Sequence, residues 1–414
     1  MSQPDSEKRP VALVLYHYLY PDDVVSSVLF SDLCAGLTER GWKVVGSACN
    51  RGCRDEGKKY PARSHWKGVD FWRVWRPRFR QSSGLGRLAN ALWMIACWSL
   101  MALDPRIRPD LVLMGTDPIL SPVVVFAWRI LRPRVRFAHW CHDLYPDAAI
   151  AAGLVEEGTP AVRSIKWLLG AAYRRQSLIV DIGACMRRLL ESYRSGACME
   201  TIPPWALVEL EGPAPVDAGE QRELFGDARI GLLYSGVFGR AHTSEGLAEL
   251  ARALADRGGR VVFSVGGNAA EELRESMRQS GAPVTFAPMV STDRLAARLS
   301  AADVQIVTLR ESWTGTVIPS KFFGALAIGR PVLFVGSPDS AIATWITELG
   351  VGWVLRSGAV EEVVKELMFL ADNPEPKAEL FRHCHKVYME KFSRGQALDR
   401  WDVCLRGALK AGKG

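Results

Sequence analysis

The sequence lacks the patterns that mark secreted and membrane-spanning proteins. Its nine cysteines are odd in number and include no CxxC pair, which argues against a disulfide framework and for a reducing compartment. The first ten residues, MSQPDSEKRP, are polar, so no signal peptide is expected. The longest uncharged run, residues 88–103, has sixteen residues, fewer than the ~20 that span a bilayer. We therefore predict a buried helix there.

Three common catalytic motifs are also absent, namely Gx₄GK[ST], GxSxG and HExxH. Metal-type residues occur in HWCH (139–142) and HCH (383–385), but neighbours on a strand point to opposite faces and no second ligand cluster accompanies them. The sequence predicts no metal site and no bound cofactor.

Positive charge is concentrated in the first half of the chain. Residues 1–205 hold 28 Lys and Arg against 19 Asp and Glu, a net +9, whereas the remainder holds 24 against 26, a net −2. A basic half beside a nearly neutral half predicts an anionic partner for the first half, such as phosphate, lipid head groups or nucleic acid.

Short β-branched runs alternate with helical patterns along both halves of the 414 residues. Strands are predicted at 11–18, 42–48, 111–115, 135–142 and 178–183, and then at 230–236, 261–267, 284–290, 304–310, 331–337 and 352–355. A helix between Pro21 and Arg40 ends at Gly41, and residues 201–220, with four prolines, read as a linker. The fold class is therefore α/β, with two Rossmann-like doubly wound parallel-sheet domains facing a central cleft.

Two glycine-containing loops follow strands in the second half. Gly236 and Gly239 precede a predicted helix with Thr243 or Ser244 as N-cap, where backbone N–H groups can approach a phosphate and Arg240 can add a cation. Gly266 and Gly267 form a second such loop in SVGGN. A plain tight turn explains one such glycine pair about as well, but two loops of this kind in the same domain favour phosphate binding.

The stretch TGTVIPSKFFGALAIGRPV, residues 314–332, contains no acidic residue. Pro319 suits the first turn of a helix, Ser320 can donate a hydrogen bond to an anion, and Lys321 places an ammonium at the same helix start. A lysine at a helix start is commonplace, but here it follows a buried strand whose carboxyl end would face the ligand.

The ordered set YSGVFGRAH, SVGGN, LSAADVQIVTL, VIPSKFFGALAIGRPVLF and ELGVGWVL resembles the donor domain of the family 4 retaining glycosyltransferases, which have the GT-B fold. The similarity is closest to the branch that builds bacterial exopolysaccharides, O-antigens and related lipid-linked glycans. CHDLYPDAAIAAGLV resembles the HDLxP segment of the acceptor domain, and IPPW stands where an IPNW linker usually lies. The resemblance implies an acceptor-binding domain at 1–205, a donor-binding domain at 206–385 and a returning C-terminal helix at 386–414.

The resemblance also implies roles for individual residues. Lys321 and Arg240 would face the donor diphosphate, and His142 with Asp143 would catalyse the reaction or orient the sugar. The other implied donor-binding residues are Gly236, Gly239, His242, Gly266, Gly267 and Ser320.

Two departures from the family pattern concern charge and backbone freedom. The usual donor helix carries two glutamates, whose positions fall on Thr316 and Gly324, so the ribose contact would come from Glu311 or the backbone. The usual glycine pair of the first loop is Val24 and Val25, which cannot easily take positive φ. That change leaves Asp22 and Asp23 uncertain as site residues.

Residues 66–87 interleave three tryptophans and two phenylalanines with five arginines. Aromatic and basic side chains together suit a membrane interface or a lipid-diphosphate acceptor, which would involve Arg73, Trp75, Arg76, Arg78 and Arg80. A strand with one buried face and one basic face fits the same composition, and stacking on single-stranded nucleic acid is a weaker alternative.

We therefore expect a metal-independent glycosyltransferase that takes a nucleotide sugar, a UDP-sugar rather than a GDP-sugar, as co-substrate. The acceptor would be lipid-linked or hydrophobic, and the protein would be cytoplasmic, in peripheral contact with the inner face of the membrane and not with nucleic acid. Two alternatives share the double fold: a nucleotide-sugar epimerase, and a catalytically silent partner of another transferase.

Overall fold

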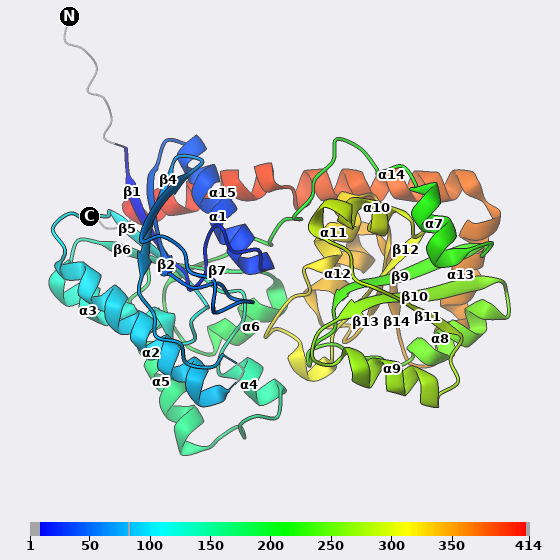
Figure 1. Cartoon of the computed structure of the whole chain (residues 1–414), viewed down its shortest axis with the longest axis horizontal. Helices are drawn as coiled ribbons and strands as arrows, with labels where there is room; N and C mark the ends of the chain where they lie inside the picture. Colours follow the sequence, from blue (N-terminus) through cyan, green and yellow to red (C-terminus); the bar gives the residue numbers. More distant parts are fainter. Residues whose placement is uncertain (1–8, 82, 411–414) are drawn as a thin grey trace, which may run out of the picture. The chain divides into compact units, whose positions relative to one another are not determined.

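The computed structural model describes residues 9–81 and 83–410. They form two compact units, residues 9–203 with 397–410, and residues 204–396 (Figure 1). Each unit is built on one twisted β-sheet with helices on both faces. The predicted returning segment, 386–414, starts inside a helix of the second unit, and only its residues from Ala397 onward group with the first.

The first unit has eight strands in the order β3-β4-β2-β1-β5-β6-β7-β8. Their bounds are β1 Val11–Leu15, β2 Lys43–Cys49, β3 Arg63–Trp66, β4 Val69–Val74, β5 Leu111–Gly115, β6 Arg136–Trp140, β7 Leu178–Asp181 and β8 Cys198–Thr201. All pairings are parallel except that of the edge strand β3 with β4, which corrects the expectation of a purely parallel sheet. β3 and β8 were not among the predicted strands, and β4 lies within residues 66–87, where a strand was one of the interpretations.

Helices cover both faces of this sheet. They are α1 Val25–Glu39, α2 Gly84–Leu100, α3 Val124–Leu131, α4 Asp147–Ala151, α5 Pro160–Tyr173, α6 Ala184–Glu191 and α15 Arg394–Lys410, with short 3₁₀ turns η1 Met101–Leu103 and η2 Ser121–Val123. Alternate residues of β1, Leu13 and Leu15, share a buried cluster with α2 and α3. The α15 helix docks through Trp401, whose ring centroid lies 5.1 Å from that of Trp140.

The second unit has six strands, all parallel, in the order β11-β10-β9-β12-β13-β14. The strands β9 Ile230–Val237, β10 Gly259–Gly266, β11 Val284–Ala287, β12 Val304–Thr308, β13 Val332–Val335 and β14 Gly352–Leu355 confirm the six predictions, with differences at the ends. The helical elements are α7 Ala218–Phe225, α8 Leu247–Ala255, α9 Ala270–Gln279, η3 Thr292–Arg294, α10 Leu295–Ser300, η4 Glu311–Trp313, α11 Lys321–Ala327, α12 Ala341–Leu349, α13 Val360–Asp372 and α14 Pro374–Lys391.

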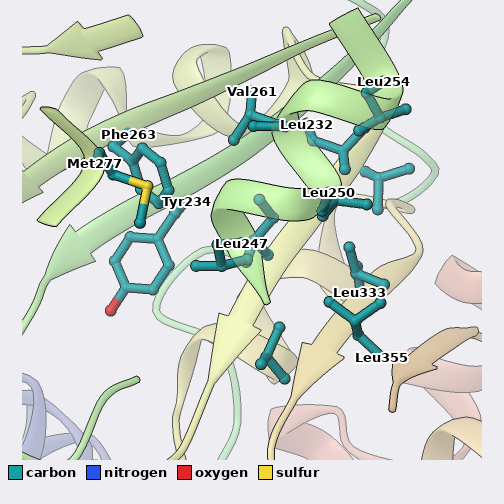
Figure 2. Close-up of a cluster of buried hydrophobic side chains, with 14 of the residues drawn as sticks. Leu232, Tyr234, Leu247, Leu250, Leu254, Val261, Phe263, Met277, Leu333 and Leu355 are labelled. Atoms are coloured by element: carbon teal, nitrogen blue, oxygen red, sulfur yellow. The ribbon is translucent and has the colours of Figure 1, made fainter. Parts of the chain in front are cut away.

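A continuous apolar cluster lies between this sheet and α8. Figure 2 shows Leu247, Leu250 and Leu254 of α8 together with strand residues such as Leu232 and Tyr234, all buried. The three leucines recur at intervals of three and four, so one helix face is buried continuously. This packing holds the strand that carries the candidate site.

The predicted linker, 201–220, is shorter than expected and is fixed to the second unit. Thr201 still belongs to β8, and Ala218 already begins α7. Between them, the backbone N–H of Ala206 donates to the Tyr388 hydroxyl at 3.0 Å, and that hydroxyl donates to the Glu209 carboxylate. These bonds tie the segment to α14.

Both sheets reverse their strand order next to their first strand. The neighbours at the reversal are β1 and β5 in the first unit, and β9 and β12 in the second. Loops that leave the carboxyl ends of such neighbours diverge in opposite directions, which opens a binding position at the sheet edge. The candidate residues gather at these two places.

Candidate functional site

At the reversal in the second unit, the chain leaves β9 beside the start of α11. Gly236 has φ +118°, and a Cβ there would lie 3.1 Å from the Lys321 Cε. Glycine is therefore needed for its backbone angle and for the approach of the lysine side chain. The Lys321 Nζ donates to the Val237 carbonyl at 3.0 Å and lies 5.0 Å from the centre of the Tyr234 ring.

Aromatic packing fixes the start of α11, and burial changes the charge behaviour of Lys321. The next two residues, Phe322 and Phe323, are buried, and their ring centroids lie 5.4 to 5.9 Å from those of Trp345 and Phe392. Burial lowers the pKa of Lys321 to about 8, because the ammonium loses hydration there. A site that disfavours a bare ammonium gains most from an anionic ligand.

The loop after β9 is fixed to the end of β12. The His242 Nδ1 lies 2.8 Å from the Thr308 carbonyl, and the Arg310 guanidinium donates to the His242 carbonyl at 2.8 Å. Burial, followed by the nearby Lys321 cation, lowers the pKa of His242 to about 3, so this imidazole is neutral near pH 7. A neutral ring can accept as well as donate a hydrogen bond.

The second glycine loop packs directly on the first. Gly267 has φ +107°, and a Cβ there would lie 2.8 Å from the Phe238 carbonyl oxygen. The Phe238 N–H donates to the Gly266 carbonyl at 2.7 Å, and a Cβ on Gly239 would lie 3.6 Å from Asn268. These contacts give Gly266 and Gly267 a packing role; a role in donor binding stays a prediction.

Three other residues predicted to bind the donor, Arg240, Glu311 and Ser320, lie near the loop after β9. Arg240 and Glu311 are exposed, and Ser320 is half-buried at the N-cap of α11, which spans seven residues. The predicted N-caps of the next helix are wrong, because α8 begins at Leu247 with Gly246 as N-cap. The charge at this place therefore comes from side chains, chiefly Lys321.

The two positions that usually carry glutamate differ in their surroundings. Thr316 is buried, and its hydroxyl donates to the Trp313 carbonyl at 2.9 Å. Gly324 is half-buried in α11, and a Cβ there would meet only Leu299, at 4.0 Å. Space for a side chain is thus available at Gly324.

At the reversal in the first unit, an ion pair joins the loops after β1 and β5. The His17 Nδ1 lies 3.1 Å from Asp117 Oδ1, and the His17 N–H donates to the Asp117 carbonyl at 2.9 Å. Burial alone would lower the pKa of His17, but the Asp117 carboxylate outweighs it and raises this pKa to about 9. Asp117 is 42% exposed, so its second oxygen faces solvent or a ligand.

His142 and Asp143 follow β6, next to the same loop. Their backbone N–H groups both donate to the Thr116 hydroxyl, at 2.9 and 3.3 Å. Burial, together with the nearby His139, lowers the pKa of His142 to about 3, so its ring is neutral. Burial first, and the Asp117 charge second, raise the pKa of Asp143 to about 6.

The predicted pair His142 and Asp143 thus belongs to a cluster that also contains His17 and Asp117. These two residues were not predicted as site residues. A usable signal existed, since each follows a buried strand directly, in VLYHY and LMGTDP. What the sequence could not give is their contact across one hundred residues.

The first loop of this unit departs from a phosphate-binding shape, as its valines indicate. Val24 is the N-cap of α1 at φ −70°, an ordinary extended angle. Asp22 is buried, and its carboxylate accepts from the Cys53 N–H at 2.7 Å, whereas the exposed Asp23 lies 3.6 Å from Arg54. Asp22 therefore has a structural role.

The basic aromatic segment, residues 66–87, contains both buried and exposed side chains. Residues 69–74 form β4, whose alternating burial confirms the interpretation of a strand with one buried face. Arg73 is buried and donates to backbone carbonyls of Pro61 and Tyr20, and Arg76 is fully buried, so neither belongs to the predicted contact surface. Trp75, Arg78 and Arg80 are exposed.

The metal-type residues of HCH have separate backbone partners. His383 lies 2.7 Å from the Leu349 carbonyl, and His385 lies 3.0 Å from that of Leu210. Among the residues that the structure describes, no group of three His, Cys, Asp or Glu side chains could hold a metal ion. Metal independence stays a prediction.

The chain is similar to known glycosyltransferases. Residues 27–205 match the family of glycosyl transferase 4-like domains. A probable glycosyltransferase, WbjE of Pseudomonas aeruginosa, is 22% identical over 352 residues, covering 81% of this chain and 84% of WbjE.

Two solved structures share the fold. Sucrose-phosphate synthase from Thermosynechococcus elongatus has a TM-score of 0.73 at 16% identity, with 98% of this chain and 100% of that chain covered. Anabaena HepE, in complex with UDP and glucose, has a TM-score of 0.64 at 14% identity, with 96% and 100% covered. Residues 27–205 therefore match a glycosyl transferase 4-like domain, and the chain as a whole has the GT-B fold.

Proposed function

We propose that this protein transfers a sugar from a UDP-sugar to a lipid-linked or hydrophobic acceptor, with retention of the anomeric configuration and without a metal ion. The observation that carries the proposal is the Lys321 ammonium, which lies beside Gly236 at the carboxyl end of β9, where parallel sheets bind ligands. The HepE complex, which contains UDP, supports the choice of nucleotide.

The proposed chemistry follows from charge. Cleavage of the bond between sugar and diphosphate builds negative charge on the departing oxygens, and a cation already in position stabilises it without a proton transfer. Lys321 supplies that cation, Arg240 adds to it, and Ser320 donates a hydrogen bond. His242 completes the donor side as a neutral hydrogen-bonding ring.

We propose that the cluster of the first unit binds the hydroxyl groups of the sugar and the acceptor. The carboxylates of Asp117 and Asp143 accept hydrogen bonds from sugar or acceptor hydroxyls, and neutral His142 orients them. His17 holds Asp117 in place through the 3.1 Å contact. This division of labour puts anion binding in the second unit and hydroxyl recognition in the first.

The direct test is turnover of a panel of UDP- and GDP-sugars with a polyprenyl phosphate acceptor, followed by NMR of the product anomeric proton. A product with the donor's anomeric configuration, formed with a UDP-sugar and in the presence of a chelator, is expected. Folded protein that binds no nucleotide sugar would defeat the proposal.

The same panel separates a second candidate. Thr316 and Gly324 stand where the family usually has carboxylates, which favours a silent partner of another transferase. Such a protein would bind a nucleotide sugar without turnover. An epimerase would convert the donor with no acceptor present.

The proposal places the reaction in the cytoplasm, at the inner face of the membrane. In support, all nine cysteines are free, and five of them are buried in positions typical of reduced thiols.

A further inference from the structure

The helix that was predicted to be buried has a long exposed face. Among the described residues, one helical segment, Gly84–Leu103, is apolar and long enough to cross a membrane. Only 28% of its most apolar stretch is buried. We define the α2 face as the exposed apolar side chains on α2 and η1, namely Leu85, Leu88, Leu92, Trp93, Leu100 and Leu103.

The spacing of these residues makes a continuous stripe. Positions 85, 88, 92, 100 and 103 recur at helical intervals, with Ala96 exposed between them. Leu85 is 83% exposed and Leu100 is 63% exposed. An exposed apolar surface of this length marks an interaction site in a folded protein.

The opposite side of the helix is fixed in the core, so α2 cannot leave it to cross a bilayer. Met94 and Trp98 are fully buried, and the Trp98 indole donates to Ser47 at 3.1 Å. Asn90 is buried as well and donates to the Phe79 carbonyl at 2.8 Å. The helix therefore presents its stripe from a rigid support, side by side with α3 (Figure 1).

The sequence segment that carries the stripe has charge of one sign. Residues 71–103 contain five arginines and no acidic residue. Arg73 and Arg76 are buried, but Arg78, Arg80 and Arg87 are exposed near the first turn of α2. Trp75 is exposed beside them, and its carbonyl accepts from the Trp93 indole at 2.7 Å.

We propose that the α2 face docks the protein on an anionic lipid bilayer, with the leucines entering the interface and Arg78, Arg80 and Arg87 contacting the lipid head groups. Apolar area and clustered basic charge together give stable interfacial binding, and tryptophan suits the head-group depth. Three exposed arginines without a neighbouring carboxylate in the segment favour an anionic surface over a second copy of this basic unit. The inference deepens the proposed function, because it places the protein where a lipid-linked acceptor lies.

The test is flotation of the full-length protein with vesicles of phosphatidylglycerol and phosphatidylcholine in equal parts, beside vesicles of phosphatidylcholine alone. Binding to the anionic vesicles is expected. The double variant Leu85→Glu/Leu92→Glu should reduce it at least ~10-fold, because two inserted leucines become charged. Arg78→Glu/Arg80→Glu should also reduce it and make the remaining binding less sensitive to salt, because fewer cations attract the anionic surface.

Val403→Glu is the matched control, since Val403 is 70% exposed on α15 of the same unit. It should bind vesicles like the unchanged protein. Thermal unfolding of every variant shows whether the fold is kept. Calorimetry with UDP tests the donor site separately, so failure of docking and failure of the proposed function are distinguishable.

Two results would overturn the inference. One is equal vesicle binding by the unchanged protein and the Leu85→Glu/Leu92→Glu variant. The other is a dimer in solution that dissociates in this variant, with no vesicle binding by the unchanged protein, because the α2 face would then be an interface between two copies.

Discussion

The two units use the same position in a parallel sheet for opposite kinds of charge. At the reversal in the second unit, one partly buried ammonium, that of Lys321, lies beside a glycine backbone. At the reversal in the first, His17, Asp117, His142 and Asp143 gather around Thr116. The comparison teaches that the sheet supplies the place, while the loop residues set the charges that are presented there.

The largest effect is expected from Lys321→Ala. Loss of a preorganised cation at the leaving group lowers kcat by ~10²- to 10³-fold, because the developing charge loses its partner. Steady-state kinetics with the active UDP-sugar measure it. Lys365→Ala, at an exposed position on α13, is the control and should keep full activity. A rate for Lys321→Ala close to that of the control would break the comparison.

A smaller effect is expected from Gly236→Ala. The new Cβ lies 3.1 Å from the Lys321 Cε and demands a strained φ, so the lysine shifts and the donor KM rises about tenfold. Gly358→Ala separates the two causes. Gly358 has φ +77° but open space, so this variant should lose about 1–2 kcal/mol of stability and keep its KM. Equal KM values in both variants would show that Gly236 acts through the backbone alone.

In the first unit, Asp117→Asn is expected to shift the pH profile. The pKa of Asp143 is raised to about 6 by burial first and by Asp117 second, so activity should fall below about pH 6 as Asp143 takes up a proton. Without the Asp117 charge the pKa of Asp143 is lower, and the acid limb moves to lower pH. Asp70→Asn breaks an exposed pair with His65 on the edge of the same sheet and should leave the profile unchanged. An acid limb that stays in place would exclude this role for Asp117.

The smallest effect is expected from Gly324→Ala. Alanine has a lower conformational entropy cost in a helix and finds open space at this position, so the free energy of unfolding should rise by about 0.5–1 kcal/mol. Chemical denaturation measures it. Gly329→Ala should instead destabilise the protein, because Gly329 has φ +76° and a Cβ there would lie 2.8 Å from Pro213.

Much of the architecture could be predicted because buried parallel strands leave continuous apolar runs in the sequence. β3 and β8 escaped prediction, since RSHW and CMET are short, polar strands at the two edges of a sheet. The exposed face of α2 escaped it too. An uncharged run indicates a helix but does not say which of its sides is covered.

The site could be predicted in part. Lys321 was proposed from its place at a helix start, and His142 from the resemblance of its segment to a family motif; their roles in binding stay predictions. The contact of His17 with Asp117 joins residues one hundred positions apart, and the burial of Arg73 depends on carbonyl groups of Pro61 and Tyr20. Such partners are brought together only by the topology of the sheet.

The central claim is that the Lys321 ammonium binds the donor diphosphate. Calorimetric titration of the unchanged protein and of Lys321→Ala with UDP and with uridine tests it, because only UDP carries the diphosphate. We predict that Lys321→Ala weakens UDP binding ~10- to 100-fold and leaves uridine binding unchanged. Equal UDP affinities in the two folded proteins would contradict the account.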